Sequence, residues 1–437
     1  MVLECPLSLS QLKNECQLCL SVAGGNGYDD AGYLYNLNII YSHCMNHFPR
    51  DLSTTLQRLA RQFPVVAVTG PRQSGKTTLV CQVFDGKPYI SLEDPIELGF
   101  AQTDPRGFLQ RFAQGAIFDE AQRWPDLFSH LQGMVDADRT PGRFVLTGSQ
   151  QFGLMAGVTQ SLAGRVGLTR LLPLALSEYG QVVHKDLYTH LWLGSYPTLW
   201  QARRSPPDAI DWFSSYIATY VERDVRQLLQ VQNLSTFQRF VRLCAARTGT
   251  LLNLVSLATD AGVSHTTARH WLSALESSEL VFLLPPYYRN FGKRLVKTPK
   301  LYFTDTGLAT WLLGIRDPQL LALHPLRGAL FESWIVGEFR KFRLNRGLPA
   351  DLYFWRDNNG LEADLVFETL QGLQCVEIKS SQTITPDLVR AGQRAARFVT
   401  EPVPDPWLLH GAEESYTREG VRCISWRRFA DPCSLEA

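Results

Sequence analysis

Residues 64–78 read PVVAVTGPRQSGKTT, and this stretch decides the fold of the chain. Val65–Val68 form a short, continuous apolar run, which is typical of a central parallel strand covered on both faces. Residues 70–77 follow at once and match the P-loop pattern G-x-x-x-x-G-K-[ST]. The sequence therefore predicts an α/β fold in which a buried strand runs into a phosphate-binding loop and a helix.

The loop supplies most of the predicted nucleotide contacts. Its glycines let backbone N–H groups point toward phosphate, and the N-terminus of the next helix adds its positive end. Lys76 is predicted to reach the β- and γ-phosphates, and Thr77 to offer its hydroxyl to Mg²⁺. Since no Asn-Lys-x-Asp motif for reading guanine occurs, we expect ATP rather than GTP. The predicted nucleotide-binding residues of the loop are Gly70, Pro71, Arg72, Gln73, Ser74, Gly75, Lys76, Thr77 and Thr78.

A second apolar run ends in two acids. Residues 116–120 read AIFDE, as expected for a strand that ends in adjacent carboxylates. Asp119 is predicted to hold the Mg²⁺ shell, and Glu120 to polarise the attacking water as the catalytic base. Acidic pairs at strand ends are also common without a function, so this prediction depends on the P-loop upstream.

A third apolar run, residues 143–146, is followed by polar residues. Ser149 or Thr147 is predicted to lie beside the γ-phosphate and to sense hydrolysis, although Ser and Thr also serve as ordinary turn residues at strand ends. Arg165, in the stretch SLAGR, is predicted to contact the γ-phosphate in cis or to act in trans as an arginine finger. The role in trans would require a homo-oligomer, and a surface ion pair is the alternative.

These motifs together resemble those of a known family. The runs GPRQSGKTT, FDEAQ, LTGS and LAGR are similar to those of prokaryotic AAA-type ATPases that carry a C-terminal domain of unknown function, number 4143. The resemblance extends from about Phe48 to near the C-terminus. It implies an AAA-like core, a winged helix and a nuclease-like final domain, and it leaves the biological task undefined.

Composition limits the other possibilities. The 437 residues are expected to form roughly three domains. Because 43 Lys and Arg residues oppose 42 Asp and Glu residues, any nucleic-acid-binding surface must be local. The longest apolar stretches, such as 171–176, are far too short to span a membrane. After residue 44 the cysteines are scattered singly, and no second pair follows that could complete a zinc site with Cys16 and Cys19. This pattern indicates a cytoplasmic protein.

The middle of the chain is predicted to be helical. Hydrophobic residues recur at helical spacing over 208–230. Residues 254–275 resemble a helix-turn-helix, with the turn at 261–263 and Ser264 as the N-cap of the second helix. The residues expected to face outward from that second helix, where a DNA reader contacts bases or phosphates, are His265, Thr266, Arg269 and His270.

Residues 287–300 are the most basic segment of the chain and contain interleaved aromatic residues. Such a segment could follow a phosphate backbone, so DNA is a predicted partner of this segment and of the helix-turn-helix. The alternative for the helix-turn-helix is a lid or a protein contact, and for the basic segment it is a solvated wing or a face that binds acidic residues of a neighbouring domain.

The last domain is predicted from a hairpin. Two strands, 361–367 and 373–379, flank a short turn. A turn centred between residues 370 and 371 places four polar side chains on one face, as the opposed pairs Asp364–Glu377 and Glu362–Lys379.

Opposed carboxylates repel each other unless a cation lies between them, and a divalent metal meets this need. The arrangement resembles the Asp…Glu-x-Lys core of restriction-endonuclease-like nucleases. In such a core Asp364 and Glu377 would bind the metal, Lys379 would stabilise the attacking hydroxide, and Glu332 would add a further acid from the helix over 330–342. The alternative is a surface ion pair in a domain that keeps the fold without cleavage.

The predicted architecture has five parts. These are a disordered segment or an extension upstream of the true start (1–48), an AAA-like ATPase core (49–180), a helical connector (181–245), a winged helix (246–300) and a restriction-endonuclease-like α/β domain (301–437). The predicted function is ATP hydrolysis coupled to nucleic-acid binding or cleavage. The alternative is a nucleotide-dependent switch or scaffold whose C-terminal domain binds a protein partner.

Overall fold

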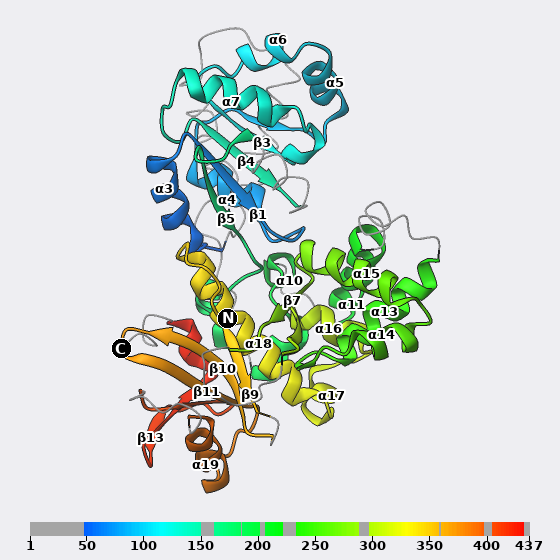
Figure 1. The fold of residues 1–437 in the computed structure, drawn as a ribbon, viewed down its shortest axis with the longest axis vertical. Helices are drawn as coiled ribbons and strands as arrows, with labels where there is room; N and C mark the ends of the chain where they lie inside the picture. Colours follow the sequence, from blue (N-terminus) through cyan, green and yellow to red (C-terminus); the bar gives the residue numbers. More distant parts are fainter. Residues whose placement is uncertain are drawn as a thin grey trace, which may run out of the picture. The chain divides into compact units, whose positions relative to one another are not determined.

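The computed structural model describes most of the chain from Phe48 onward, and Figure 1 shows its fold. The described ranges are 48–149, 161–184, 186–201, 206–221, 233–287, 297–357, 360–396 and 404–431. Three predictions fall outside these ranges. They concern the N-terminal segment (residues 1–47), the end of the helix over 208–230 (residues 222–230) and most of the basic segment (residues 288–296). Phe48–Ala437 forms one compact unit.

Five parallel strands form the first sheet, in the order β2-β3-β4-β1-β5. Every residue of the central strands β1 and β4 is buried, which confirms the predicted strand before the P-loop. The five strands are β1 (Val65–Thr69), β2 (Tyr89–Ser91), β3 (Ala116–Asp119), β4 (Phe144–Gly148) and β5 (Val166–Arg170).

Helices cover both faces of this sheet (Figure 1). The side chains of β1 alternate between the two faces: Val65 and Ala67 join the aromatic core around Phe108 and Phe118, and Val66 joins the aliphatic core under the first two helices. The helices of this part are α3 (Leu52–Gln62), α4 (Lys76–Val83), α5 (Pro95–Thr103), α6 (Pro105–Gln110) and α7 (Leu127–Ala137).

The parallel order fixes which motif residues meet. The P-loop follows β1, Asp119 ends β3, and Ser149 directly follows β4, which lies between those two strands. Because the carboxyl ends of parallel strands lie at one edge of a sheet, these groups converge there. Arg165 comes just before β5 and pairs its carbonyl with the N–H of Val65, so it lies at the opposite edge.

The chain then passes through helices into a small sheet. The predicted helix-turn-helix is present: Gly262 ends α14 in a left-handed conformation, and the side chain of Ser264 accepts the N–H of Thr267 to cap α15. The three strands of the small sheet lie in the order β6-β8-β7. The elements of this part are η2 (Leu176–His184), α9 (Leu187–Leu193), α10 (Pro197–Gln201), α11 (Pro206–Tyr216), η3 (Ile217–Val221), α13 (Leu234–Ala246), β6 (Thr250–Leu251), α14 (Leu254–Ala261), α15 (His265–Ser277), β7 (Val281–Leu284) and β8 (Lys300–Phe303).

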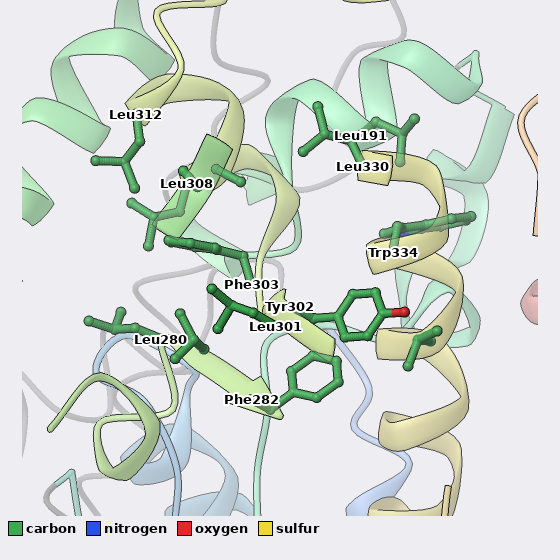
Figure 2. Close-up of a cluster of buried hydrophobic side chains, with 14 of the residues drawn as sticks. Leu191, Leu280, Phe282, Leu301, Tyr302, Phe303, Leu308, Leu312, Leu330 and Trp334 are labelled. Atoms are coloured by element: carbon green, nitrogen blue, oxygen red, sulfur yellow. The ribbon is translucent and has the colours of Figure 1, made fainter. Parts of the chain in front are cut away.

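The small sheet packs on the helices that follow it. Figure 2 shows Phe282 of β7 and Tyr302 of β8 in one buried cluster with Leu308 and Trp334. The rings of Phe282 and Tyr302 are stacked, with centroids 5.4 Å apart. The helices are α16 (Thr306–Leu312), α17 (Pro318–Leu323) and α18 (Arg327–Asn345).

Among all the helices that the structure describes, none has the length and apolar character that a membrane crossing requires.

A six-stranded mixed sheet completes the chain, in the order β13-β14-β12-β11-β10-β9. Strands β9, β10 and β11 are antiparallel, whereas β12 runs parallel to β11. The elements are β9 (Tyr353–Arg356), β10 (Glu362–Thr369), β11 (Gly372–Lys379), α19 (Pro386–Ala395), β12 (Trp407–His410), β13 (Tyr416–Arg418), β14 (Val421–Ser425) and η4 (Trp426–Ala430).

The predicted hairpin register is confirmed where the ladder is regular, since Leu365 pairs with Val376 and Thr369 with Gly372. Regular alternation along the predicted strand 361–367 places Ala363 on the apolar face with Leu365, but this prediction is wrong, because Ala363 packs on the other side of the sheet with Val366. The reason is an irregularity in the pairing with β9 between these two residues, because an extra residue in one strand reverses the alternation of side chains.

Candidate functional site

Two glycines give the P-loop its shape. A Cβ atom on Gly70 would lie 2.0 Å from the carbonyl oxygen of Leu171, so no other residue fits there. Gly75 has a φ of 92° and is the N-cap of α4, a conformation that favours glycine. Residues 71–74 form the turn between β1 and α4, and Thr78 lies in the first turn of that helix.

Lys76 lies over the loop that it follows. Its ammonium donates hydrogen bonds to the carbonyl oxygens of Gly70 (3.1 Å) and Pro71 (2.9 Å). Burial lowers the pKa of Lys76, while the carboxylates of Glu120 and Asp119 oppose this shift. The ammonium thus lies at the predicted phosphate-binding loop, near the predicted metal ligand Asp119 and the predicted base Glu120.

Asp119 is the centre of a hydrogen-bonded group. The hydroxyl of Thr77 lies 3.2 and 3.1 Å from its two carboxylate oxygens, and Tyr89 donates to it at 2.8 Å. Thr147 of β4 also donates to this carboxylate. A hydroxyl and a carboxylate in contact are the oxygen ligands that P-loop proteins use for Mg²⁺. The geometry of Thr77 and Asp119 fits the predicted metal role.

Tyr89 is a contact that no motif predicted. It lies on β2, the neighbour of β3, and burial raises the pKa of its hydroxyl, with the charge of Asp119 adding to the effect. The phenol therefore remains a donor to Asp119 throughout the neutral range.

Glu120 lies directly after β3 in a left-handed conformation, with a φ of 53° that side chains rarely adopt. Its carboxylate accepts hydrogen bonds from the Ser149 hydroxyl (2.9 Å) and from Gln122. Burial raises the pKa of Glu120, but the Lys76 ammonium and these donors outweigh burial and lower it overall. Glu120 is thus an ionised carboxylate beside Lys76, able to accept a proton, and Ser149 contacts it directly.

Arg165 does not join this group. Its guanidinium forms a bidentate pair with Asp136 of α7, with N–O distances of 2.7 and 2.9 Å. Because it precedes β5, it lies at the edge of the sheet opposite the P-loop. The structure therefore corrects the predicted contact in cis and instead shows the ion pair that was the alternative.

Arg50 is a site residue that sequence reasoning missed. Its guanidinium donates to the carbonyl oxygens of Ser74 in the P-loop (2.6 Å) and of Leu172 (2.7 Å), and it forms an ion pair with Glu178 at 3.0 Å. Glu178 is fully buried and accepts the backbone N–H of Asp51 at 2.8 Å. Arg50 thus connects the P-loop to residues 171–178, which we call the exit segment because it leaves β5.

The exit segment is also held by α18. Glu338 accepts the N–H of Leu176 at 2.8 Å, and Lys341 donates to the carbonyl oxygen of Leu174 at 2.8 Å. Both side chains are buried and form an ion pair with each other, also at 2.8 Å. A continuous polar chain therefore runs from the P-loop through Arg50 and the exit segment to α18.

The predicted acids of the C-terminal domain come together at one end of the β10–β11 hairpin. Lys379 lies 3.2 Å from Asp364 and 2.7 Å from Glu377. Lys379 turns to those two carboxylates, whereas Glu362, the residue predicted to oppose it, pairs with Arg356 at 3.2 Å.

A lysine that the hairpin spacing could not predict completes this group. The ammonium of Lys300, from β8, lies 2.8 Å from Glu332, 2.6 Å from Glu362 and 3.7 Å from Asp364. Tyr302 also donates to Glu332, at 2.6 Å. Within the described ranges, no group of three or more His, Cys, Asp or Glu side chains is arranged to hold a metal ion.

The protonation of this acidic group is uneven. Burial, with the charge of Asp364, raises the pKa values of Glu332 and Glu377 to about 7. Asp364 is also buried, but Lys379 and Lys300 hold its pKa below the usual range. Lys300 itself stays charged, because its three carboxylate neighbours raise its pKa against the effect of burial.

Three family models match consecutive parts of the chain. The model described as an AAA domain matches residues 62–180, and two models described as domains of unknown function match residues 184–319 (DUF8612) and 327–429 (DUF4143).

Two curated relatives are similar over most of the chain. The uncharacterized proteins Rv2008c of Mycobacterium tuberculosis and Mb2031c of Mycobacterium bovis are each 36% identical over 355 residues, which cover 80% of this chain and 78% of the relative. The Walker-type ATPase PABY2304 of Pyrococcus abyssi aligns at 16% identity and a TM-score of 0.42, over 61% of this chain and 96% of that chain. DnaA from Aquifex aeolicus, bound to AMPPCP, aligns at 14% identity and a TM-score of 0.26, over 52% of this chain and 85% of that chain.

Proposed function

We propose that this chain, which belongs to the family of AAA-type P-loop ATPases with a C-terminal DUF4143 domain, hydrolyses ATP with Mg²⁺ and acts as a nucleotide-dependent switch. The observation that carries the proposal is the meeting of three groups at one edge of the sheet. These are the Lys76 ammonium over the P-loop, the Thr77–Asp119 contact, and an ionised Glu120 beside Lys76.

Each residue then has a defined task. The N–H groups of the P-loop and the Lys76 ammonium bind the phosphates, and Thr77 and Asp119 hold the magnesium ion. When bound, Mg²⁺ supplies positive charge that favours attack at the γ-phosphate. Glu120 accepts a proton from the attacking water, while Ser149 and Gln122 keep its carboxylate oriented.

The polar chain through Arg50 supports the switch. Arg50 binds the carbonyl of Ser74, so a nucleotide-dependent shift of the P-loop changes the position of its guanidinium. The same guanidinium holds the exit segment, and Glu338 and Lys341 join that segment to α18. Because α18 also carries Glu332, this helix connects the ATPase core to the acidic group of the last domain.

The test is steady-state ATP hydrolysis and fluorescent-nucleotide binding, in wild type and in Lys76→Ala. We expect Lys76→Ala to bind ATP about 10–100-fold more weakly, because a charged hydrogen-bond donor to phosphate is worth about 1.5–3 kcal/mol. Lys87→Ala is the matched control, since Lys87 precedes β2 at the other edge of the sheet and donates to the carbonyl of Arg143. Equal affinities in wild type and Lys76→Ala would contradict the proposed phosphate site.

A second candidate function, nucleic-acid binding, is supported by α15. Its outward residues are exposed, while Ala268, Leu272 and Leu275 on its other side are buried. The order α13, β6, α14, α15, β7, β8 supports a winged helix, a fold in which the second helix of the helix-turn-helix reads DNA. The predicted outward residues are His265, Thr266, Arg269 and His270.

Fluorescence anisotropy with a mixed-sequence duplex over a salt series tests this candidate. We expect Arg269→Ala to weaken binding to all DNA sequences. It should also reduce the slope of the logarithm of the binding constant against the logarithm of the salt concentration by about one, as the loss of a single phosphate contact does. Arg242→Ala removes an exposed arginine of α13 and is the control. If Arg269→Ala and Arg242→Ala bind as wild type does, α15 is not the DNA-binding helix.

A further inference from the structure

Three carboxylates of the last domain converge on one buried cation that belongs to the chain. The ammonium of Lys300 lies within 3.7 Å of Glu332, Glu362 and Asp364, and its side chain is only 4% exposed. These acids come from two separate elements, α18 and β10, and the lysine comes from a third, β8. Figure 2 shows the neighbouring Tyr302 projecting from β8 toward α18, where its hydroxyl binds Glu332.

Burial makes this cation necessary. Carboxylates that share a buried site repel one another, so they stay ionised only when a positive charge lies among them. Lys379 provides a second cation, between Asp364 and Glu377, and Arg356 a third, on Glu362. The four acids thus meet three cations of the chain itself.

A divalent metal would occupy the same place as the Lys300 ammonium. Mg²⁺, Mn²⁺ and Ca²⁺ bind carboxylate oxygens at about 2.0–2.6 Å. Glu332, Glu362 and Asp364 are arranged around the Lys300 ammonium instead, and within the described residues they are not grouped as metal ligands. An ion at that distance from these oxygens would overlap the ammonium, which lies 2.6 Å from Glu362 and 2.8 Å from Glu332. The residues present therefore do not fit a metal while Lys300 is in place.

The strand order explains why a metal would be expected at all. The Asp…Glu-x-Lys pattern predicts a restriction-endonuclease-like fold, and the order of the elements supports it. That order is α18, β9, β10, β11, α19, β12, in which three antiparallel strands are followed by a parallel one. The resemblance to such nucleases implies a divalent ion bound by Asp364 and Glu377, with Glu332 as a further acid. Lys300 contacts two of these three residues, Asp364 and Glu332.

We infer that Lys300 is a built-in cation that replaces the metal ion of a nuclease-like site, so that the last domain is assembled without metal and does not carry out metal-dependent cleavage. This inference rests on the Lys300 group alone and not on the proposed ATP hydrolysis. It assigns the acidic group a structural role, and it is consistent with a switch whose last domain binds a partner.

Thermal unfolding of the full-length, EDTA-treated, nucleotide-free protein tests the inference. We expect the melting temperature of wild type to be unchanged by millimolar MnCl₂. Lys300→Met keeps the volume of the side chain but leaves three carboxylates without their cation, so it is expected to melt about 5–10 °C lower. Millimolar MnCl₂ should restore at least half of that loss, because the ion can then take the place of the ammonium.

Lys341→Met is the matched control. It also removes a buried ammonium of this region, one that binds Glu338, the carbonyl oxygen of Leu174 and the hydroxyl of Ser195 and lies outside the acidic group. It should lose stability without recovering it in MnCl₂. A charge-balanced variant, Lys300→Met with Glu332→Gln, is expected to melt closer to wild type if Lys300→Met proves too unstable to purify.

Two results would overturn the inference. One is a stabilisation of wild type by MnCl₂ that disappears in Asp364→Asn, because a metal would then bind among the acids despite Lys300. The other is a failure of MnCl₂ to stabilise Lys300→Met more than Lys341→Met. Neither result depends on ATP turnover, so a failure here is distinguishable from a failure of the proposed ATPase function.

Discussion

Glu120→Gln is expected to bind ATP as wild type does and to hydrolyse it about 10²–10⁴-fold more slowly, the usual contribution of a general base. The amide is nearly the same size as the carboxylate and can still accept the hydrogen bond from Ser149, so the site should keep its shape. It cannot take up a proton from water. A coupled assay of phosphate release and fluorescent-nucleotide titration measure the two properties separately.

The control for this variant is Glu97→Gln. Glu97 lies on α5 and is paired with Arg111, outside the group around the P-loop. Normal turnover in both variants would show that Glu120 is not the base. A loss of ATP binding in Glu120→Gln would instead show that its charge is needed to hold Lys76 in place.

The sequence predicted those parts of the site that depend on local spacing. The P-loop, Asp119 and Glu120 each follow directly after an apolar run, and in parallel strands this is sufficient to bring them to one edge of the sheet. The hairpin register was also predictable, because a short turn fixes which residues oppose one another.

Arg165 shows where local spacing fails. The motif around it gives no indication of which end of a strand it occupies, and the structure places it before β5 instead of after it. The arginine at the P-loop is Arg50, which precedes the whole sheet in sequence and reaches the loop only because α3 packs beside it.

Lys300 illustrates the same limit in the last domain. The opposed carboxylates of the hairpin correctly indicated that a cation must lie among them, and the sequence suggested a metal. Between Asp364 and Glu377 that cation is Lys379 of the hairpin itself. A second cation, Lys300, comes from a strand of another sheet, so only the tertiary packing of β8 beside α18 and β10 reveals it. The sequence predicted that a positive charge must lie near these carboxylates, but it did not predict that Lys300 supplies part of that charge.

Arg50→Met is expected to destabilise the protein by about 3–5 kcal/mol, because it leaves the fully buried Glu178 without its cation. The effect should depend on pH. Burial raises the pKa of Glu178 and Arg50 opposes this, so the pKa rises further in the variant. A carboxyl whose folded pKa lies above its unfolded value loses stability as the pH rises, so the destabilisation should be larger at about pH 8 than at about pH 5.

Urea denaturation at the two pH values, with and without ATP, measures this effect. Arg61→Met, an exposed position of α3, the helix that follows Arg50, is the control and should change stability by less than about 0.5 kcal/mol. The double variant Arg50→Met with Glu178→Leu should recover part of the stability, since it removes both buried charges. It cannot restore the bond to Ser74, so a stable double variant should still have ATP binding uncoupled from the exit segment. If that variant regains both stability and the wild-type response to ATP, Arg50 is only a structural ion pair and the signal to α18 follows another route.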